Sequence, residues 1–453
     1  MKVYSNILDM VGQTPMLEVT NIDTGLCRLF LKLELMNPGG SIKDRIGISM
    51  IEQAEKRGDI KPGDTLVEAT AGNTGLGLAL VAARKGYHLI LVLPDKMSQE
   101  KIFNLSAMGA EIILTRSDVN RGHPEYYQDL GRAIAEEKNA YFINQFGNFD
   151  NPLAHEIGTA PEILNQMNGD LDAIVLGVGS SGTVSGISKY LKEHAPNVEM
   201  ILADPEGSVL TDWINKGELK AGGSWLVEGI GEDFIPDIAN FEKVTKAYSI
   251  SDAESFQVAR DLLRQEGVLA GSSSGTCIAA ALKYCREQTE PKRVVTFACD
   301  TGNKYLSKLF NNFWMEDQGF IKRNQFGDLR DFIGRLHSDG ATSTVGPTDT
   351  LTTAHNRLRN SGFSQLPVVN DGKLLGVITE KSIINFTIEQ PELMLSAVKE
   401  AMELSFPKLD KKDNFNKLRE RLSDQSYTVI LDGKKFLGLV TRSDVINFIR
   451  KKI

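Results

Sequence analysis

Short apolar runs alternate with longer amphipathic stretches over the first 315 residues of the chain. Each run is followed by Gly, Asp or Pro, and the runs predict strands at 66–70, 89–94, 111–115, 173–179, 200–206 and 293–300. Stretches such as 74–85 and 101–108, which lie between the runs, have helical periodicity. Near-continuous apolar strands that alternate with helices are typical of a parallel sheet covered on both faces. We therefore expect an α/β fold for residues 1–315.

The C-terminal part of the chain contains an internal repeat. The segment LLGVITEKSIINF (374–386) aligns without a gap with FLGLVTRSDVINF (436–448). Each copy reads as a hairpin-like strand that enters a helix, and a helical stretch of the type seen at 353–363 precedes it. Residues 341–453 are therefore predicted to be two copies of one small α/β unit, at about 341–390 and 395–453. The charged segment 316–340 has no strand-like run and is predicted to be a partly helical linker.

Length and composition place the chain among ordinary globular proteins. Its 453 residues correspond to two to four domains at roughly 100–200 residues per domain. The net charge of −8, with no basic stripe, argues against nucleic-acid binding. We find no apolar run of the ~20 residues that a membrane helix needs, and the N-terminal stretch does not resemble a signal peptide.

The cysteines and histidines point to a reducing compartment and to no metal site. The four cysteines form no CxxC pair, which fits buried thiols in the cytoplasm. The six histidines do not occur at metal-ligand spacing, so we expect no metal centre.

Four polar segments at predicted strand or helix ends carry candidate chemistry. Lys43 follows a Gly-Gly turn in NPGGSIKDR (37–45) and could be either a reactive amine or a solvated lysine. GVGSSGTVSGI (177–187) follows a strand and opens a helix, where backbone N–H groups and the helix dipole favour a phosphate. TAGNTG (70–75) suits a small anion such as a carboxylate, or is simply a helix cap. The serines of AGSSSGT (270–276) could cap a helix or hydrogen-bond a ring nitrogen.

These four segments would meet in one place if the sheet is parallel, because ligands of open α/β sheets bind at the carboxyl ends of the strands. A cofactor with an aldehyde, a phosphate, a ring oxygen and a ring nitrogen would use all four segments. Pyridoxal phosphate has these groups, and Lys43 would hold it as a Schiff base.

Residues 5–315 resemble the cysteine synthase/cystathionine β-synthase family of pyridoxal-phosphate enzymes, which have fold type II. The resemblance covers nearly all of that span and rests on these segments: VGQTPM (11–16), KLELMNPGGSIKDR (32–45), GNTG (72–75), NPLAH (151–155), GSSGTVSGI (179–187), DPEGS (204–208), EGIGEDFIP (228–236) and GSSSG (271–275). It implies two parallel-sheet α/β subdomains followed by a tandem pair of "CBS" modules.

The resemblance also implies roles for individual residues. Lys43 would bind the cofactor and later remove the Cα proton of the substrate, Asn73 would hydrogen-bond the ring hydroxyl, and Ser273 would meet the pyridine nitrogen. The remaining roles fall to groups of residues: the phosphate to Gly179, Ser180, Ser181, Gly182 and Thr183; the substrate carboxylate to Thr70, Ala71, Thr74 and Gln145; the amino group and second substrate to the loop with Gly229 and Gly231.

The expected reaction is a β-replacement on a small amino acid. A neutral serine at the ring nitrogen makes a weaker electron sink than an aspartate would, which suits direct β-elimination followed by thiol addition. DPEGS, EGIGEDFIP and the C-terminal repeat favour the cystathionine β-synthase branch, in which serine or O-acetylserine condenses with homocysteine. Hydrogen sulfide release from cysteine is a possible side activity. The alternatives are a cysteine synthase that uses O-acetylserine and sulfide, a ligand-sensing protein with an inactive enzyme domain, and a dehydratase of the same fold.

Two positions depart from the animal members of this branch. Ala71 stands where a serine is usual, and Phe146 stands where a tyrosine is usual. The loss of these hydroxyls could weaken assistance to a departing hydroxide, so we expect O-acetylserine to be used as well as serine or better. The N-terminal extension that carries haem in animal homologues is missing, so we expect no haem.

The C-terminal pair resembles modules that bind adenosyl ligands between their copies. The ribose of such ligands is usually held by a Thr and an Asp, and copy two has both, Thr441 and Asp444. Copy one has Thr379, but Ser382 replaces the aspartate. We therefore expect at most one well-formed site, for S-adenosylmethionine, AMP or ATP; the alternative is a dimerisation module without a ligand. Family members are homodimers or larger assemblies.

Overall fold

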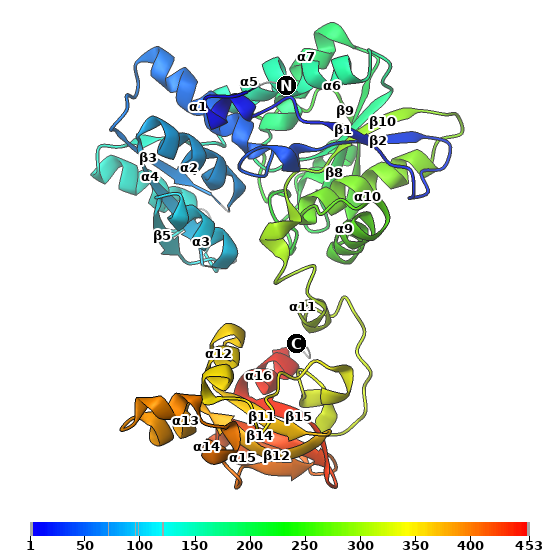
Figure 1. The fold of residues 1–453 in the computed structure, drawn as a ribbon. Helices are drawn as coiled ribbons and strands as arrows, with labels where there is room; N and C mark the ends of the chain where they lie inside the picture. The colour runs from blue at the N-terminus through cyan, green and yellow to red at the C-terminus, as the bar shows by residue number, and fades with distance from the viewer. Residues whose placement is uncertain (1–2, 71, 96, 98, 120–121, 451–453) are drawn as a thin grey trace. The chain divides into compact units, whose positions relative to one another are not determined.

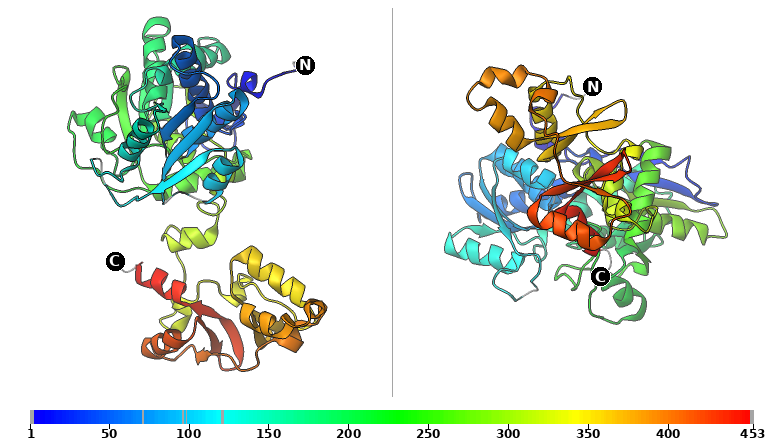
Figure 2. Two further views of the ribbon diagram at one scale, coloured as in Figure 1. Left: turned by 90° about the vertical axis from the view of Figure 1, so that its left-hand side faces the viewer. Right: turned by 90° about the horizontal axis from the view of Figure 1, so that it is seen from below.

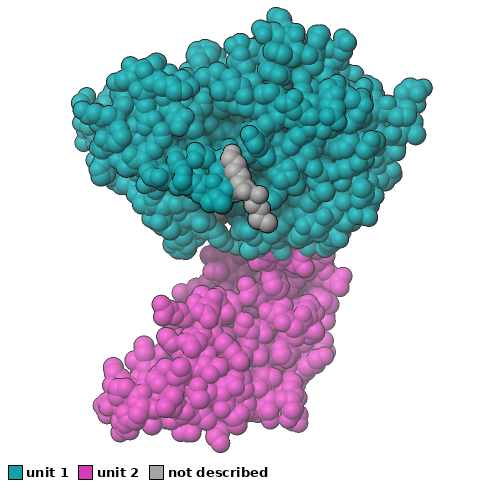
Figure 3. Space-filling view, turned by 45° about the horizontal axis from the view of Figure 1, so that its top comes forward, with its two compact units in different colours: residues 1–310 teal, residues 311–453 magenta. Residues whose placement is uncertain are grey.

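The computed structural model describes residues 3–70, 72–95, 97, 99–119 and 122–450. The chain divides into two compact units, residues 1–310 and residues 311–453, which Figure 3 colours separately. The division falls five residues before the expected boundary at 315.

The first unit contains a large mixed sheet. Its strands are, in spatial order, β1 (Met16–Glu18), β2 (Arg28–Lys32), β10 (Arg293–Phe297), β7 (Ala173–Gly177), β8 (Glu199–Pro205) and β9 (Val244–Ile250). All neighbours pair in parallel except β1 with β2. One face packs against α9 (Asp252–Glu266) and α10 (Ser272–Arg286). The other face packs against α6 (Ala160–Gln166), α7 (Gly182–His194) and α8 (Leu210–Lys216). Figure 1 labels α6 and α7.

A second, fully parallel sheet lies beside the first (Figure 1). Its order is β5 (Glu111–Thr115), β4 (His88–Pro94), β3 (Thr65–Ala69) and β6 (Tyr141–Phe142). Helices α1 (Lys43–Arg57), α2 (Asn73–Lys85) and α3 (Gln99–Ala107) cover one face, and α4 (Tyr127–Glu137) packs on the other. The run LILVLP of β4 is buried throughout, because both faces of this strand are covered. The strands expected from apolar runs are all present, as β3, β4, β5, β7, β8 and β10.

The second unit contains the two repeat copies. In the first copy, β11 (Gln365–Asn370) and β12 (Lys373–Thr379) form a hairpin that leads into α13 (Glu380–Thr387). In the second copy, β14 (Tyr427–Asp432) and β15 (Lys435–Thr441) lead into α16 (Arg442–Arg450), and β13 (Lys408–Asp410) adds a strand. Helices α12 (Leu351–Ser361), α14 (Val398–Ala401) and α15 (Phe415–Asp424) complete the unit, which Figure 2 shows from two further directions. A shared cluster of Val377, Tyr427, Val429 and Phe436 joins the copies.

The segment expected to be a linker, 316–340, belongs to the second unit instead. It follows α11 (Asn312–Asp317) and contains the short helices η5 (Leu329–Phe332) and η6 (His337–Asp339). Leu329, Ile333 and Leu336 are buried in a cluster with residues of the second copy. These apolar residues are spaced too widely for a strand-like run, which is why the pattern predicted a linker. Among the described helices, we find none with the length and apolar character that a transmembrane span requires.

Candidate functional site

Lys43 is placed by an unusually close approach of two helices. It is the first residue of α1, and α1 crosses α2 at two glycines. A Cβ on Gly77 would lie 2.6 Å from the carbonyl oxygen of Lys43, and a Cβ on Gly47 would lie 2.7 Å from the backbone of Gly77. Only glycine permits these distances, and the contact holds Lys43 beside Asn73 at the start of α2.

Lys43 lines a cavity of about 650 Å³. Its ammonium is desolvated, so burial lowers the pKa of Lys43, although the negative charge available at Cys299, Glu232 and Asp300 opposes the shift. None of the described residues is within hydrogen-bonding distance of Lys43 Nζ. The lowered pKa favours the neutral amine, which is the reactive form.

The start of α7 lines the same cavity as Lys43. Gly179, Ser180, Ser181, Gly182 and Thr183 all line the cavity, as the phosphate prediction requires. Ser181 has a positive φ of 66°, and its buried Oγ has no hydrogen-bond partner among the residues that the structure describes. The first turn of α7 also has no side-chain cap, so its N–H groups face the cavity without an acceptor from a capping residue.

Gly182 is required by the packing behind this loop. A Cβ there would lie 1.8 Å from Oδ1 of Asn151. The Asn151 side chain cannot move away easily, because its Nδ2 donates to Ser180 Oγ at 2.9 Å and to the carbonyl of Gln145 at 2.9 Å.

A buried histidine, His155, is hydrogen-bonded to Thr183. Nε2 of His155 is hydrogen-bonded to Thr183 Oγ1 at 3.2 Å, and Nδ1 to Thr159 Oγ1 at 2.9 Å. Both His155 and Thr159 belong to a π-helical turn, η3 (His155–Thr159). Burial holds the pKa of His155 well below its usual value, so the ring is neutral and fixes the threonine hydroxyl without adding charge.

The three serines at the start of α10 have different surroundings. Ser272 Oγ accepts from the backbone N–H of Glu228 at 3.0 Å, and Ser274 Oγ accepts from that of Cys299 at 2.9 Å. Ser273 is the serine of this trio that lines the cavity. The geometry therefore favours Ser273 as the candidate partner of a ring nitrogen.

The segment predicted to meet a substrate carboxylate lies at the end of β3. Thr70 is buried, and its Oγ1 accepts from the N–H of Gly72 at 3.1 Å. Thr74 Oγ1 donates to Gln145 Oε1 at 2.7 Å, and Gln145 Nε2 donates to the carbonyl of Ala69 at 3.2 Å. Thr70, Thr74 and Gln145 line the same cavity as Lys43. Ala71, predicted for the same role, lies outside the described residues.

Asn73 is held by an ionic cluster that sequence reasoning did not anticipate. Its Nδ2 donates to Asp300 Oδ2 at 2.7 Å, and its Oδ1 accepts from Lys304 Nζ at 3.0 Å. Tyr305 donates to the same Asp300 oxygen at 2.7 Å. Asp300 comes shortly after β10, and a polar residue following a buried strand was the signal that could have identified it.

The glycines of the 228–236 loop, Gly229 and Gly231, both line the cavity and both have positive φ, 89° and 88°. Gly231 N–H donates to the carbonyl of Val178, which ties the loop to the segment before the phosphate loop. Phe146 also lines the cavity and packs on Phe234, with ring centroids 5.6 Å apart.

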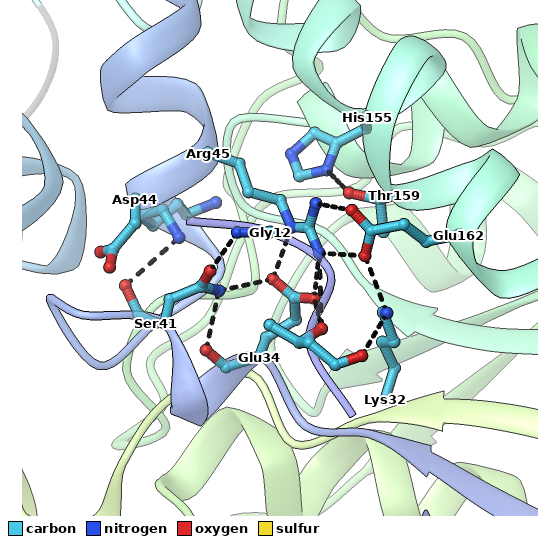
Figure 4. Close-up of polar contacts among 12 residues, drawn as sticks. Gly12, Lys32, Glu34, Ser41, Asp44, Arg45, His155, Thr159 and Glu162 are labelled. Carbon is cyan, nitrogen blue, oxygen red and sulfur yellow. Dashed lines mark hydrogen bonds and ion pairs between the residues drawn. The ribbon is translucent and has the colours of Figure 1, made fainter. Parts of the chain in front are cut away.

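A buried ion network anchors the base of α1 two residues after Lys43 (Figure 4). The guanidinium of Arg45 lies between two carboxylates: Nε and Nη2 donate to Glu34 at 2.8 Å, and Nη1 and Nη2 donate to Glu162 at 2.7 Å. Lys32 Nζ donates to Glu162 at 2.8 Å. The pairing holds the pKa of Glu162 at about 2. The network connects the N-terminal segment, β2 and α6 to the helix that carries Lys43.

The residues around the cavity fit pyridoxal phosphate. An amine of lowered pKa and the uncapped start of α7 line one cavity, and Ser181 Oγ is buried there without a hydrogen-bond partner among the described residues. Lys43 would hold the aldehyde, the α7 loop the phosphate, and Ser273 the ring nitrogen. The structure brings all described members of the predicted site together; their individual roles remain predictions.

The second unit contains a separate cavity of about 540 Å³. Both predicted ligand residues, Thr441 and Asp444, line it together with Ser364 and Gln365 of the first copy. Asp444 Oδ2 accepts from the Thr441 N–H at 2.7 Å and from its hydroxyl at 2.5 Å. Arginines 323, 335 and 442 add positive charge to the same walls.

In the first copy, Thr379 and Ser382 cap α13 reciprocally, and the Thr379 hydroxyl also donates to Glu403 at 2.9 Å. Thr441 and Asp444 form the same reciprocal cap at α16, so the two copies differ in the capping side chain, a neutral serine in one and a carboxyl in the other. The single well-formed site stays a prediction.

Comparison with known proteins places these observations in a family. Residues 7–300 match the family model "Pyridoxal-phosphate dependent enzyme", and residues 340–389 match "CBS domain". The chain is 37% identical to cystathionine β-synthase of Apis mellifera over 99% of this chain and 92% of that protein. The solved structure of an O-acetylserine dependent cystathionine β-synthase from Helicobacter pylori is 39% identical, with a TM-score of 0.62 over 68% of this chain and 99% of that one. A hydrogen sulfide-producing enzyme from Fusobacterium nucleatum is 36% identical, with a TM-score of 0.62 over 67% of this chain and 100% of that one.

Proposed function

The chain belongs to the cystathionine β-synthase family of pyridoxal-phosphate dependent enzymes, and we propose that it joins the carbon skeleton of serine or O-acetylserine to the sulfur of homocysteine to give cystathionine. The observation that supports this most is the position of Lys43, which lines one cavity together with the uncapped start of α7. In this proposal, Lys43 binds the aldehyde of the cofactor and the α7 loop binds its phosphate. The amino-acid substrate then binds beside Thr70 and Gln145.

Bound pyridoxal phosphate supplies an electron-withdrawing ring that acidifies the Cα–H bond of the amino acid attached to it. Lys43 Nζ would remove that proton, and the lowering of its pKa by burial favours the neutral amine that this step needs. The loop of Thr70, Thr74 and Gln145 orients the substrate carboxylate, so that the Cα–H bond points towards Lys43.

Ser273 determines the electronic character of the site. A neutral hydroxyl next to the ring nitrogen does not fix a proton there, unlike a carboxylate. With Ser273 at the ring nitrogen, the bound cofactor would be a weaker electron sink, which suits a β-replacement.

The direct test combines purified, cofactor-loaded protein with homocysteine and either serine or O-acetylserine, and identifies cystathionine by mass. Sulfide serves as a parallel acceptor. Cystathionine formed well above cysteine supports the proposal. Cysteine from sulfide as the only product would identify a cysteine synthase and refute it.

We propose that O-acetylserine is used as well as serine or better. Phe146 presents an aromatic ring without a hydroxyl to the cavity, and the H. pylori enzyme of similar structure is described as O-acetylserine dependent. The kcat/KM ratio of the two donors decides this point, and a clear preference for serine would contradict it. We also propose a side activity that releases hydrogen sulfide from cysteine, since the F. nucleatum enzyme of similar structure is named for that product.

We propose that the cavity of the second unit binds one adenosyl ligand, S-adenosylmethionine, AMP or ATP, with Thr441 and Asp444 at the ribose. Isothermal titration calorimetry with each compound tests this. Absence of heat for all three, on protein whose folding has been checked, would support a purely structural module.

We further propose a cytoplasmic homodimer or larger homo-oligomer that needs no haem. The reaction has no net electron transfer, so no redox group is required. The Cys277 and Cys299 sulfurs lie 4.0 Å apart as free thiols, which fits a reducing compartment. Phe149 and Ile157, 73% and 66% exposed, offer apolar surface near α7 for a partner subunit. Light scattering coupled to gel filtration measures the assembly.

A further inference from the structure

We propose that Glu232 is a catalytic acid–base residue: its carboxyl gives a proton to the hydroxyl that leaves serine and then takes the proton of the incoming thiol. The inference rests on the proposed function, because it concerns the same cavity and substrates. Neither the family match nor the expected roles of the 228–236 loop assign this residue.

The backbone of Glu232 is held firmly. Its N–H donates to Ser208 Oγ at 3.1 Å, and its carbonyl accepts from the same hydroxyl at 3.1 Å. The carbonyl also accepts from the N–H of Val209 at 2.9 Å. Together with the positive φ of Gly231, these contacts fix where the side chain starts.

The side chain of Glu232 lines the cavity, and its carboxyl group is available to interact with the substrate. None of the described residues hydrogen-bonds to its carboxyl oxygens, although the residue is largely buried. One of these oxygens, Oε1, lies 3.9 Å from the position that a Cβ on Gly179 would occupy, so the carboxyl is close to the phosphate loop. A carboxyl with no structural partner in a reaction cavity is a candidate for proton transfer.

The charged and titratable groups around Glu232 come from four elements. Asp233 neighbours it on the loop, Asp204 belongs to β8, Lys43 begins α1 and Tyr127 begins α4. Desolvation, with the negative charges of Asp233 and Asp204, raises the pKa of Glu232 well above its usual value, and Lys43 only partly offsets this. This shift favours the protonated carboxyl, the form in which Glu232 begins the proposed cycle as an acid.

The two proton transfers balance within one turnover. In the first half, the Cβ–O bond of serine breaks, and the departing oxygen takes the Glu232 proton and leaves as water. In the second half, the thiol S–H proton passes to the Glu232 carboxylate as the S–Cβ bond forms. Glu232 ends the cycle protonated, and Lys43 handles only the Cα proton.

The raised pKa of Glu232 brings it closer to the pKa of a thiol, and the first proton transfer is needed only when serine is the donor. A free thiol has a pKa of ~8.5, so a carboxyl of raised pKa accepts its proton at a smaller energetic penalty than an ordinary glutamate would. Acetate is a stable anion and leaves O-acetylserine without a proton. Glu232 therefore matters for loss of the β-substituent only when serine is the donor.

The test compares wild type, Glu232→Gln and Asp237→Asn. Asp237 is an exposed carboxylate five residues further along, and its substitution removes one formal charge without altering the cavity. Each cofactor-loaded protein is first mixed with the donor alone, and the change in cofactor absorbance is timed. Steady-state cystathionine formation from O-acetylserine and homocysteine is then measured from pH 7 to 9.

We expect E232Q to slow the first step by roughly 100-fold with serine and by less than about threefold with O-acetylserine. Its activity with O-acetylserine is expected to be low at pH 7 and to recover towards pH 9, where homocysteine ionises unaided. D237N is expected to match wild type. As a readout independent of activity, the infrared difference spectrum of wild type minus E232Q at pH 7 should contain the band of a protonated carboxyl.

Equal slowing with both donors, no slowing with either, or the same donor-selective loss in D237N would overturn the role of Glu232. A different result bears on the proposed function alone: if wild type makes no cystathionine but E232Q still shows the donor-selective first step, homocysteine is not the acceptor and the acid role of Glu232 stands.

Discussion

Replacing Arg45 by Met removes the centre of the buried ion network that anchors α1 (Figure 4). Arg45 is 6% exposed and Glu34 is fully buried. After the substitution, Glu34 keeps the Thr14 hydroxyl at 2.6 Å and the Asn37 amide at 2.8 Å but has no cation at its carboxylate. Methionine fills much of the same volume and has a similar helix propensity, so the loss of charge dominates.

The expected loss is large because one buried charge is left without its partner. Removing one member of a buried ion pair destabilises a protein by about 3–5 kcal/mol. The pKa shift of Glu162 gives a second estimate of the stabilisation. The pKa is about 2 in the folded protein and 4.5 in the free group, and this difference corresponds to roughly 3 kcal/mol. Lys32 still pairs with Glu162 at 2.8 Å, so we expect R45M to lose about 3–4 kcal/mol.

The effect depends on pH with a definite sign. The folded pKa of Glu162 is depressed, so its stabilisation is complete above about pH 4.5 and is lost as the pH falls towards 2. In R45M, the unpaired Glu34 carboxyl would have a raised pKa, so acid relieves the buried charge. The difference in stability between wild type and R45M should therefore shrink as the pH falls from 7 to 4.

Urea unfolding measures the difference in a Trp314→Phe background, in which the remaining tryptophans, Trp213 and Trp225, report on the first unit. Arg57→Met is the matched control. Arg57 lies on the same helix but is 45% exposed and pairs with Asp59 and Asp150, so we expect a loss of at most about 1 kcal/mol. A loss for R45M no larger than that of R57M would refute the reasoning about the buried network.

Three further predictions concern the two cavities. Lys43→Ala should abolish cystathionine formation and the visible absorbance of a covalently held cofactor, and an absorbance spectrum unchanged from wild type would show that another residue holds it. Gly182→Ala should weaken pyridoxal phosphate binding by at least about tenfold, because the new methyl group would meet Asn151 Oδ1; equilibrium dialysis of cofactor measures this, and an unchanged affinity would mean that the phosphate lies elsewhere. Asp444→Asn should remove adenosyl-ligand heat in calorimetry without changing basal activity, and retained binding would place the ribose away from α16.

Much of the site could be predicted from the sequence, because its residues lie at the ends of regular elements. A lysine after a Gly-Gly turn, a Gly-Ser loop after a strand, and a serine cluster before a helix are local patterns, and parallel strands bring their carboxyl ends to one edge. The tertiary structure places all of the described candidates around one cavity. It also distinguishes Ser273 from its neighbours Ser272 and Ser274, a choice that the sequence alone supported only through the family resemblance.

Other features could not be predicted because they depend on contacts between distant segments. Strand β9 was missed: its sequence VTKAYSI mixes polar and apolar residues, since the strand pairs only with β8 at the edge of the sheet. The segment 316–340 was expected to be a linker, yet its scattered apolar residues are buried in the second unit.

The sequence by itself determined the α/β class, the repeat and the positions of the polar loops, because these follow from periodicity and from residues adjacent along the chain. Only the tertiary structure decided which carboxyls lie in the cavity and which are neutralised. Glu34 and Glu232 are both glutamates in motifs of the same family, but Glu34 is paired with Arg45 while Glu232 faces the cavity without a hydrogen-bond partner among the described residues. Desolvation and the arrangement of neighbouring charges set their pKa values, and neither quantity exists until the chain is folded.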